Sequence, residues 1–194
     1  AAAGWTFKDR KLVNAKTGKP FTFRILLVQP TWERIALPFV RNLKRLGIDA
    51  SVRTVDTAQY QKRLEEFDFD MVVGVFGQSL SPGNEQRDLW SSAAAATPGS
   101  RNIIGIKDKV VDPLINLIIA APDWKSLVAR TRALDRVLLW GYYVIPHWHI
   151  RSFRVAFWNK FGRPEINPKY GLCMDCWWID AKKEAALNAA RKEK

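Results

Sequence analysis

The 194-residue sequence lacks the features that identify several common protein classes. No run of apolar residues approaches the ~20 that a helix needs to span a bilayer. The first residues, AAAGWTFKDRK, contain no apolar segment of the kind found in signal peptides. There is no G-x-S-x-G motif, no phosphate-binding loop and no pair of carboxylates arranged for acid–base catalysis. The residues therefore give no direct sign of a membrane-spanning protein or of a common hydrolase or nucleotide-binding enzyme.

Cysteine and histidine are scarce, with two of each. Cys173 and Cys176 form C-M-D-C in a late irregular segment, whereas a redox C-x-x-C usually begins a helix and a zinc site needs further ligands. A disulfide, free thiols, and metal or redox chemistry all stay open for this pair. His147 and His149 flank Trp148, and on a strand both would share one face. Without an acidic residue nearby in sequence, this pattern favours a strand end with Trp148 facing the core or a cleft over a metal pair.

The charge is strongly one-sided, with a formal net charge of +12. Such a balance is typical of proteins that bind nucleic acid or anionic membranes. The Lys and Arg residues are scattered, however, and they form no block of the length seen in interaction tails. The pattern favours a soluble domain with a basic surface, and a basic nucleic-acid-binding α/β domain stays as the alternative.

Hydrophobic periodicity predicts a strand–helix succession in the first half of the chain. Strands are predicted at 21–28, 48–55 and 70–76, and a helix at 33–46 that ends at Gly47. Asp56 with Gln59 forms a capping box that begins a short helix between the second and third strands. This order predicts βαβ units and a mostly parallel sheet flanked by helices.

The second half is predicted to be mainly helical at first and irregular later. The expected helices are 85–92, 108–121, 123–140 and 181–194, and the expected strands are 142–150 and 152–158.

A polar loop, GQSLSPGNEQRD (77–88), follows the third predicted strand. In open α/β sheets, ligands bind beyond the carboxyl ends of the strands. Gly77 and Gly83 allow close approach of the backbone, and Pro82 stiffens the loop, which lowers the entropy lost on binding. The loop is therefore a candidate for ligand recognition, and the other interpretation is a solvated connection that caps the next helix.

The order of motifs resembles the C-terminal part of the extracellular solute-binding proteins of ABC importers, family 5. The resemblance rests on GKPFTFRILLV, RNLKRLGI, DASVRTVDTAQYQKRLEEFDFDMVVG and ARTRALDRVLLWGYYVIPHWH. SPGNEQRDLW and GSRNIIGIKD look most similar to the branch linked to oligopeptide and microcin C uptake. The resemblance implies an α/β, type II periplasmic-binding-protein-like lobe. Residues 1–158 would be the C-terminal lobe, incomplete at its N-terminus, and 159–194 a hinge crossover and tail returning to the first lobe.

The resemblance also implies what the protein does. It would bind peptides or peptide-like solutes between two lobes and deliver them to the permease subunits of an ABC importer, with no cofactor, no nucleic acid and no chemistry on the ligand. A periplasmic monomer is expected, with the export signal in a preceding part of a longer chain. The rival enzyme hypothesis uses Cys173 with Cys176, or His147 with His149. The residues expected to line the cleft are Phe76, Gln78, Ser79, Ser81, Asn84 and Glu85, with Trp148 and His149.

One position departs from the family pattern. Many peptide binders of this group carry an Asp just after the third strand, which pairs with the α-ammonium of the peptide. The matching position here is Gln78. Because Gln is neutral, the charge-assisted bond to an ammonium is lost. Either Glu85 supplies the charge instead, or the ligand is a modified peptide or another solute.

Overall fold

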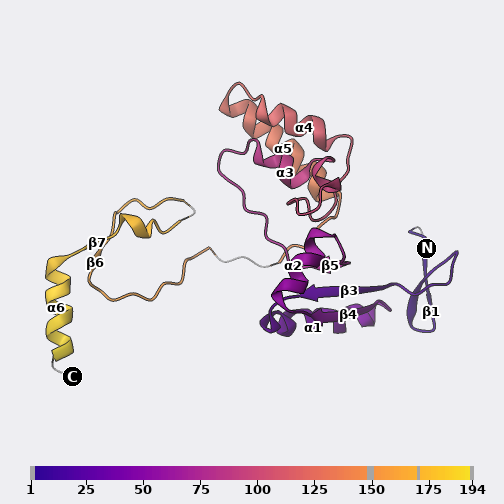
Figure 1. Cartoon of the computed structure of the whole chain (residues 1–194), viewed down its shortest axis with the longest axis horizontal. Helices are drawn as coiled ribbons and strands as arrows, with labels where there is room; N and C mark the ends of the chain where they lie inside the picture. The colour runs from indigo at the N-terminus through magenta and orange to yellow at the C-terminus, as the bar shows by residue number, and fades with distance from the viewer. Residues whose placement is uncertain (1–2, 148–150, 170, 193–194) are drawn as a thin grey trace. The chain divides into compact units, whose positions relative to one another are not determined.

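The computed structural model describes residues 3–147, 151–169 and 171–192. The chain divides into two compact units, Ala1–Val144 and Ile145–Lys194 (Figure 1). The boundary predicted between residues 158 and 159 falls within the second unit. The role of residues 159–194 as a hinge crossover and tail stays a prediction. None of the helices in the described ranges is long and apolar enough to cross a membrane.

A three-stranded parallel sheet in the order β4-β3-β5 forms the first half of the first unit. Its elements are β3 (Thr22–Leu27), β4 (Asp49–Thr54) and β5 (Met71–Val72), connected by α1 (Glu33–Arg45) and α2 (Thr57–Glu65). The predicted βαβ succession and parallel sheet are thus confirmed. Ile25 and Leu27 point to one face, where they pack with Ala36 of α1, because alternate residues of a strand point to opposite faces.

The ends of the two crossover helices follow the sequence signals. Asp56 caps α2 by accepting a hydrogen bond from the Gln59 amide at 2.8 Å. Gly47 follows α1 with a φ of +75°, a left-handed conformation that favours glycine. A Cβ at Gly47 would also lie 2.6 Å from the Phe7 ring and 2.7 Å from the Leu12 nitrogen, so a larger residue would not fit there. Pro38 is accommodated inside α1.

The antiparallel hairpin of β1 (Trp5–Lys8) and β2 (Lys11–Asn14) was not predicted. Its two-residue turn is formed by Asp9 and Arg10, both with positive φ. Such a turn suits the right-handed twist of paired strands. The missed signal was the polar pair Asp9–Arg10 between two short segments with apolar residues, of which only the first, residues 5–8, alternates.

The third strand is much shorter than predicted. Residues 70–76 were expected to form a strand, but β5 pairs with β3 only over Met71–Val72. Val75 is 91% exposed, and the Phe76 ring instead packs against Trp90, with 4.9 Å between ring centroids. The apolar run therefore divides between the sheet and a separate helical core.

That helical core forms the second half of the first unit. It consists of α3 (Glu85–Trp90), α4 (Val111–Ile119) and α5 (Trp124–Trp140), and the helices predicted here are confirmed. Figure 1 shows α4 and α5 side by side. The segment between α3 and α4, which contains η2 (Ala94–Ala96), buries Ala95, Asn102 and Ile106. The buried residues of this core are Leu89, Trp90, Ile106, Val111, Ile115, Ile118 and Leu134.

One fully buried polar side chain, Asn102, braces the connection between α3 and α4. Its amide nitrogen donates to the carbonyl oxygens of Ser91 at 2.9 Å and Ile106 at 3.0 Å, and its Oδ1 accepts from the Ile106 amide at 3.0 Å. A side-chain amide can satisfy three backbone groups in this way, which lets an irregular segment be buried without loss of hydrogen bonds.

The second unit contains short elements. They are β6 (Phe161–Gly162), η3 (Met174–Cys176), β7 (Trp178–Ile179) and α6 (Ala181–Lys192), of which α6 was predicted. The strands predicted at 142–150 and 152–158 are wrong for the described residues of those segments, which form no strand. Apolar alternation did predict extended chain, but a strand also needs a hydrogen-bonded neighbour, and side chains such as Ile145 and Phe153 are exposed.

We expect Asn102→Ala to lower the free energy of unfolding by about 3 kcal/mol, because it removes the hydrogen-bond partner of both the amide and the carbonyl group of the buried residue Ile106. Urea unfolding followed by tryptophan fluorescence measures the change. Asn116→Ala is the matched control, since it removes only an exposed bond to Arg87 and should cost less than about 0.5 kcal/mol. Equal effects of the two substitutions would contradict the role assigned to Asn102.

Candidate functional site

The segment that connects β5 to α3, residues 73–84, contains the first part of the polar loop and contributes to the lining of a cavity of about 420 Å³. Residues of α3 and α5 line the rest of the cavity. The volume lies in the range of small-molecule and cofactor sites. The lining residues are Phe76, Gln78, Ser79, Leu80 and Pro82 of the loop, Gln86 and Trp90 of α3, and Trp124, Leu127, Val128, Thr131, Arg132, Leu134 and Asp135 of α5.

The cavity combines an apolar body with a few polar groups. Phe76, Trp90 and Leu127 give it aromatic and aliphatic surface. Arg132 and Asp135 bring charges of opposite sign from α5, so the helix wall carries no net charge. A site of this kind gains affinity from burial of apolar groups and orientation from a small number of hydrogen bonds.

A buried glutamine organises the loop wall. Gln86 is 3% exposed, and its Oε1 accepts a hydrogen bond from the indole nitrogen of Trp90 at 3.0 Å. Its Nε2 donates to Gln78 Oε1 at 2.7 Å and to Glu85 Oε1 at 3.2 Å. Both polar ends of the Gln86 side chain are therefore satisfied, as a buried amide requires.

The carboxylate of Glu85 is directed into its own loop. Its Oε1 accepts a hydrogen bond from the Gly83 amide at 2.9 Å. Partial burial by itself would raise the pKa of Glu85, but hydrogen bonds from the amides of Gly83 and Glu85, from the Gln86 side chain and from the Ser79 hydroxyl outweigh it and lower the pKa. Glu85 is thus ionised at neutral pH and stabilises the loop.

The predicted cleft residues fall into three groups. Phe76, Gln78 and Ser79 line the cavity. Ser81, Asn84 and Glu85 belong to the same loop but are not among the lining residues. Trp148 and His149 lie outside the described residues.

Sequence reasoning missed the α5 wall and the two α3 residues. The spacing of Leu127, Thr131 and Leu134 in the sequence is that of one helix face, and these three residues line the cavity. Periodicity shows that a face is buried, but not whether a protein core or a ligand covers it. Gln86 was passed over as part of a polar run, although it lies on the buried side of α3 with Leu89 and Trp90.

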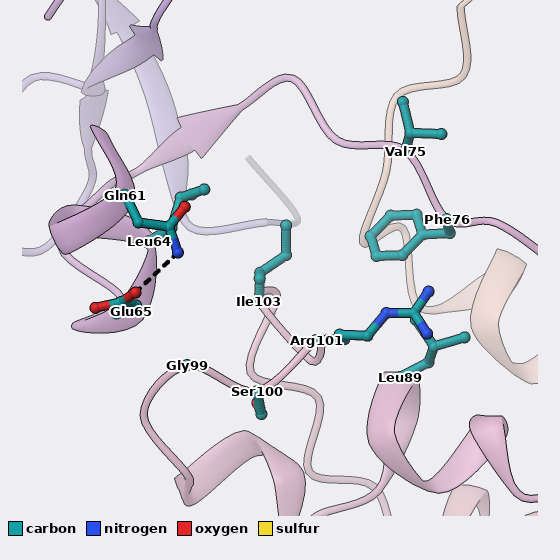
Figure 2. A pocket seen from close by; sticks show the side chains of 10 residues that line it. All are labelled: Gln61, Leu64, Glu65, Val75, Phe76, Leu89, Gly99, Ser100, Arg101 and Ile103. Atoms are coloured by element: carbon teal, nitrogen blue, oxygen red, sulfur yellow. Dashed lines mark hydrogen bonds between the residues drawn. The ribbon is translucent and has the colours of Figure 1, made fainter. Parts of the chain in front are cut away.

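A second cavity of about 180 Å³ lies between α2, residues 75–76 and the segment 99–103 (Figure 2). Phe76 lines both cavities. Gln61 of α2 donates to Glu65 at 2.8 Å along its edge. This volume is below the range of typical ligand sites, so the larger cavity is the stronger candidate.

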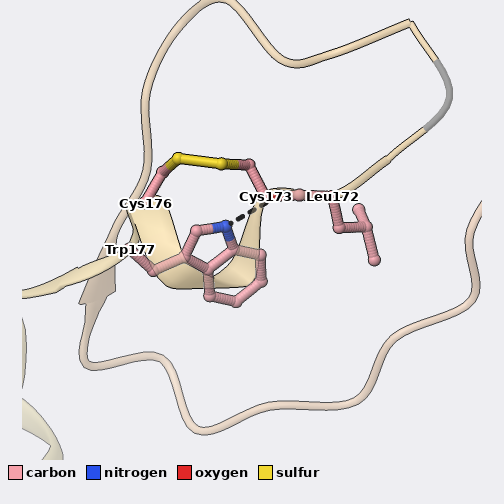
Figure 3. The surroundings of a disulfide bond; sticks show 4 residues. All are labelled: Leu172, Cys173, Cys176 and Trp177. Carbon is pink, nitrogen blue, oxygen red and sulfur yellow. Dashed lines mark hydrogen bonds between the residues drawn. A yellow bond between two sulfur atoms is a disulfide. The ribbon is translucent and has the colours of Figure 1, made fainter.

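Cys173 and Cys176 are joined in a disulfide (Figure 3). The Trp177 indole nitrogen donates to the Leu172 carbonyl oxygen at 3.2 Å beside it. In this state neither sulfur is a free thiolate for metal binding or nucleophilic attack. Among the residues that the structure describes, no group of three or more His, Cys, Asp or Glu side chains could hold a metal ion.

Comparisons with known proteins agree with the family resemblance seen in the sequence. Residues 1–98 match the model of the bacterial extracellular solute-binding proteins, family 5 middle region. An uncharacterised protein of Sinorhizobium fredii, y4wM, is 52% identical over 91% of this chain and 27% of its own length. The probable peptide-binding protein YejA of Agrobacterium fabrum is 45% identical over 91% of this chain and 29% of its own. The chain thus spans less than a third of these relatives.

Among solved structures, the oligopeptide-binding protein AppA from Bacillus subtilis, in complex with a nonapeptide, aligns with a TM-score of 0.67. The alignment covers 92% of this chain and 36% of that one at 21% identity. At this identity the likeness concerns the fold alone. It confirms the predicted type II periplasmic-binding-protein-like α/β class.

We expect Glu85→Gln to reduce the loss of stability on acidification. Because the folded-state pKa of Glu85 is lowered, its ionised form stabilises the folded protein above about pH 4.3, and this contribution is lost as the pH falls through the lowered value. Urea unfolding midpoints from about pH 7 to about pH 3 measure the effect, and the gap between wild type and variant should shrink on acidification. Glu66→Gln at the exposed end of α2 is the control. A gap that stays constant with pH would contradict the assignment.

Proposed function

The chain belongs to the bacterial extracellular solute-binding proteins of family 5, and on that basis we propose that its full-length protein binds a peptide or peptide-like solute for an ABC importer. The observation that carries the proposal is the cavity of about 420 Å³ between the polar loop and α5. The name of the YejA relative, a probable peptide-binding protein, supports peptides as the solute class. The family match favours this function over a basic nucleic-acid-binding domain.

The mechanism follows from the arrangement of the cavity. An apolar side chain of the ligand enters between Trp90 and Leu127 and is removed from water. Polar groups of the loop, held by Gln86, orient the ligand backbone. A second lobe completes the enclosure, and the closed form is the one that the membrane permease recognises. The protein does no chemistry on its ligand, acts as a monomer and is located in the periplasm.

The first test is native mass spectrometry of the full-length protein, purified gently and then denatured to release its ligand. We expect a peptide or peptide conjugate to be released. Release of nucleic acid or of stoichiometric zinc would overturn the proposal.

The second prediction concerns the cavity itself. Val128→Trp places a large ring in the space that Val128 lines, so the affinity for the released ligand should fall roughly tenfold or more. Ala129→Trp is the matched control, since Ala129 is the next residue on α5, is exposed and does not line the cavity. Isothermal titration calorimetry on both variants measures the difference. Equal affinity in Val128→Trp and wild type would place the ligand elsewhere.

Replacement of both cysteines tests the binding function against the hypothesis of a thiol-dependent enzyme. We expect the double variant Cys173→Ser, Cys176→Ser to keep the ligand affinity of the wild type within about threefold, because neither residue lines the cavity. The same titration measures it. A complete loss of binding with an unchanged unfolding midpoint would favour a thiol-dependent role instead.

A further inference from the structure

One buried hydroxyl group on the cavity lining has no hydrogen-bond partner. The Oγ1 atom of Thr131, on α5, is shielded from solvent, and no donor or acceptor within the described residues pairs with it. A buried polar group without a partner costs free energy, so native proteins contain few of them. Because threonine in a helix occupies two χ1 rotamers, this hydroxyl can turn toward a group in the cavity that Thr131 lines.

The Asp135 carboxylate, one turn further along α5, also lines the cavity. The hydrogen bonds and ion pairs found within the described residues do not involve this carboxylate. Residues four apart lie about 40° from each other around a helix axis, so Thr131 and Asp135 share one face of α5. Val128 lies on the same face one turn earlier and also lines the cavity. This face therefore combines two acceptor groups with an aliphatic surface.

Arg132 lines the cavity as well, and its positive charge opposes a cationic ligand. It lies about 100° from Thr131 around the helix axis, at the edge of the lining face. Arg132 and Asp135 are both described, and they form no ion pair with each other. Because the Arg132 side chain is exposed, its charge is largely hydrated. Glu85, which accepts a hydrogen bond from the cavity-lining Gln86, adds a second negative charge, so the carboxylates outnumber the guanidinium.

We propose that the cavity binds a basic side chain of the ligand, with its charged head held by Asp135 and Thr131 and its methylene stem packed on Val128. The inference rests on the proposed peptide-binding function. Lysine and arginine side chains combine an apolar stem with a charged head, which fits a lining with acceptors next to aliphatic surface. An ammonium group has three donors, of which the carboxylate accepts two and the hydroxyl oxygen the third. The apolar side chain that enters between Trp90 and Leu127 occupies another part of the same cavity.

A competition experiment on the full-length protein tests this preference. The probe is an equimolar pool of mixed-sequence tetrapeptides, each present in two forms that carry either lysine or Nε-acetyl-lysine at the same position. The two forms share their termini and their methylene stem, so they differ only in the head group. Bound peptides are released and identified by mass spectrometry. We expect the lysine forms to be enriched about tenfold, because a hydrogen bond to a charged group is stronger than one between neutral groups.

Three variants assign the preference to its residues. Asp135→Asn removes the charge and nearly keeps the shape, so the enrichment should fall below about twofold. Thr131→Val replaces the hydroxyl with a methyl group and should reduce the enrichment about threefold. Because this variant removes an unpaired buried oxygen, its thermal unfolding midpoint should not fall. Asp49→Asn is the charge-matched control, since Asp49 is exposed in β4 and does not line the cavity, and it should keep the wild-type enrichment.

The outcomes separate the two proposals. Binding of both peptide forms without preference, or with preference for the acetylated form, overturns the inference and leaves peptide binding in place. A preference that persists in Asp135→Asn also overturns it, since Asp135 is then not the partner. An equal loss in Asp49→Asn overturns it too, because the overall charge of the protein would then attract the lysine forms. Failure of every peptide to bind overturns the proposed function and the inference together.

Discussion

The need of buried polar groups for hydrogen-bond partners determines how the candidate site is built. Gln86 and Asn102 are buried polar side chains, and each holds an irregular segment next to α3. Asn102 satisfies backbone groups after the helix, and Gln86 ties the loop before it to Trp90 inside the core. An unpaired buried amide would cost the full free energy of its desolvation, so these bonds leave the loop few alternative conformations.

The cavity belongs to the helical core rather than to the edge of the sheet. The chain leaves the sheet after Val72, and Phe76 reaches Trp90 before the polar residues begin. The loop therefore lines the cavity together with α3 and α5, and none of the residues of β3, β4 or β5 is among the lining residues.

In the second unit, side-chain contacts are more extensive than the hydrogen-bonded pairing of strands. The Arg163 guanidinium carbon lies 5.3 Å from the Phe157 ring centroid and 5.5 Å from that of Trp177, within the range of cation–π attraction. The disulfide closes a short loop directly before Trp177, which limits the positions open to that ring. These contacts compensate for strands of only two residues each.

The sequence by itself determined the βαβ order, the parallel sheet, the caps at Asp56 and Gly47, and the helices α3 to α6. These features depend on periodicity and on local backbone chemistry, which a linear pattern records. It also pointed to the 77–88 loop, because polar residues after a buried strand are conspicuous. It failed for the described residues of the strands predicted at 142–150 and 152–158, where apolar alternation predicted strands but the described chain provides no hydrogen-bonded neighbour. Only the tertiary structure decided which residues of α5 line the cavity, because this depends on how α5 packs against residues far away in the sequence. Only the tertiary structure decided which way the Gln78 amide faces, because this depends on its hydrogen bond with Gln86. A hydrogen-bond donor or acceptor has a direction only when its partner is known, and the partner of Gln78 is fixed by Trp90 through Gln86.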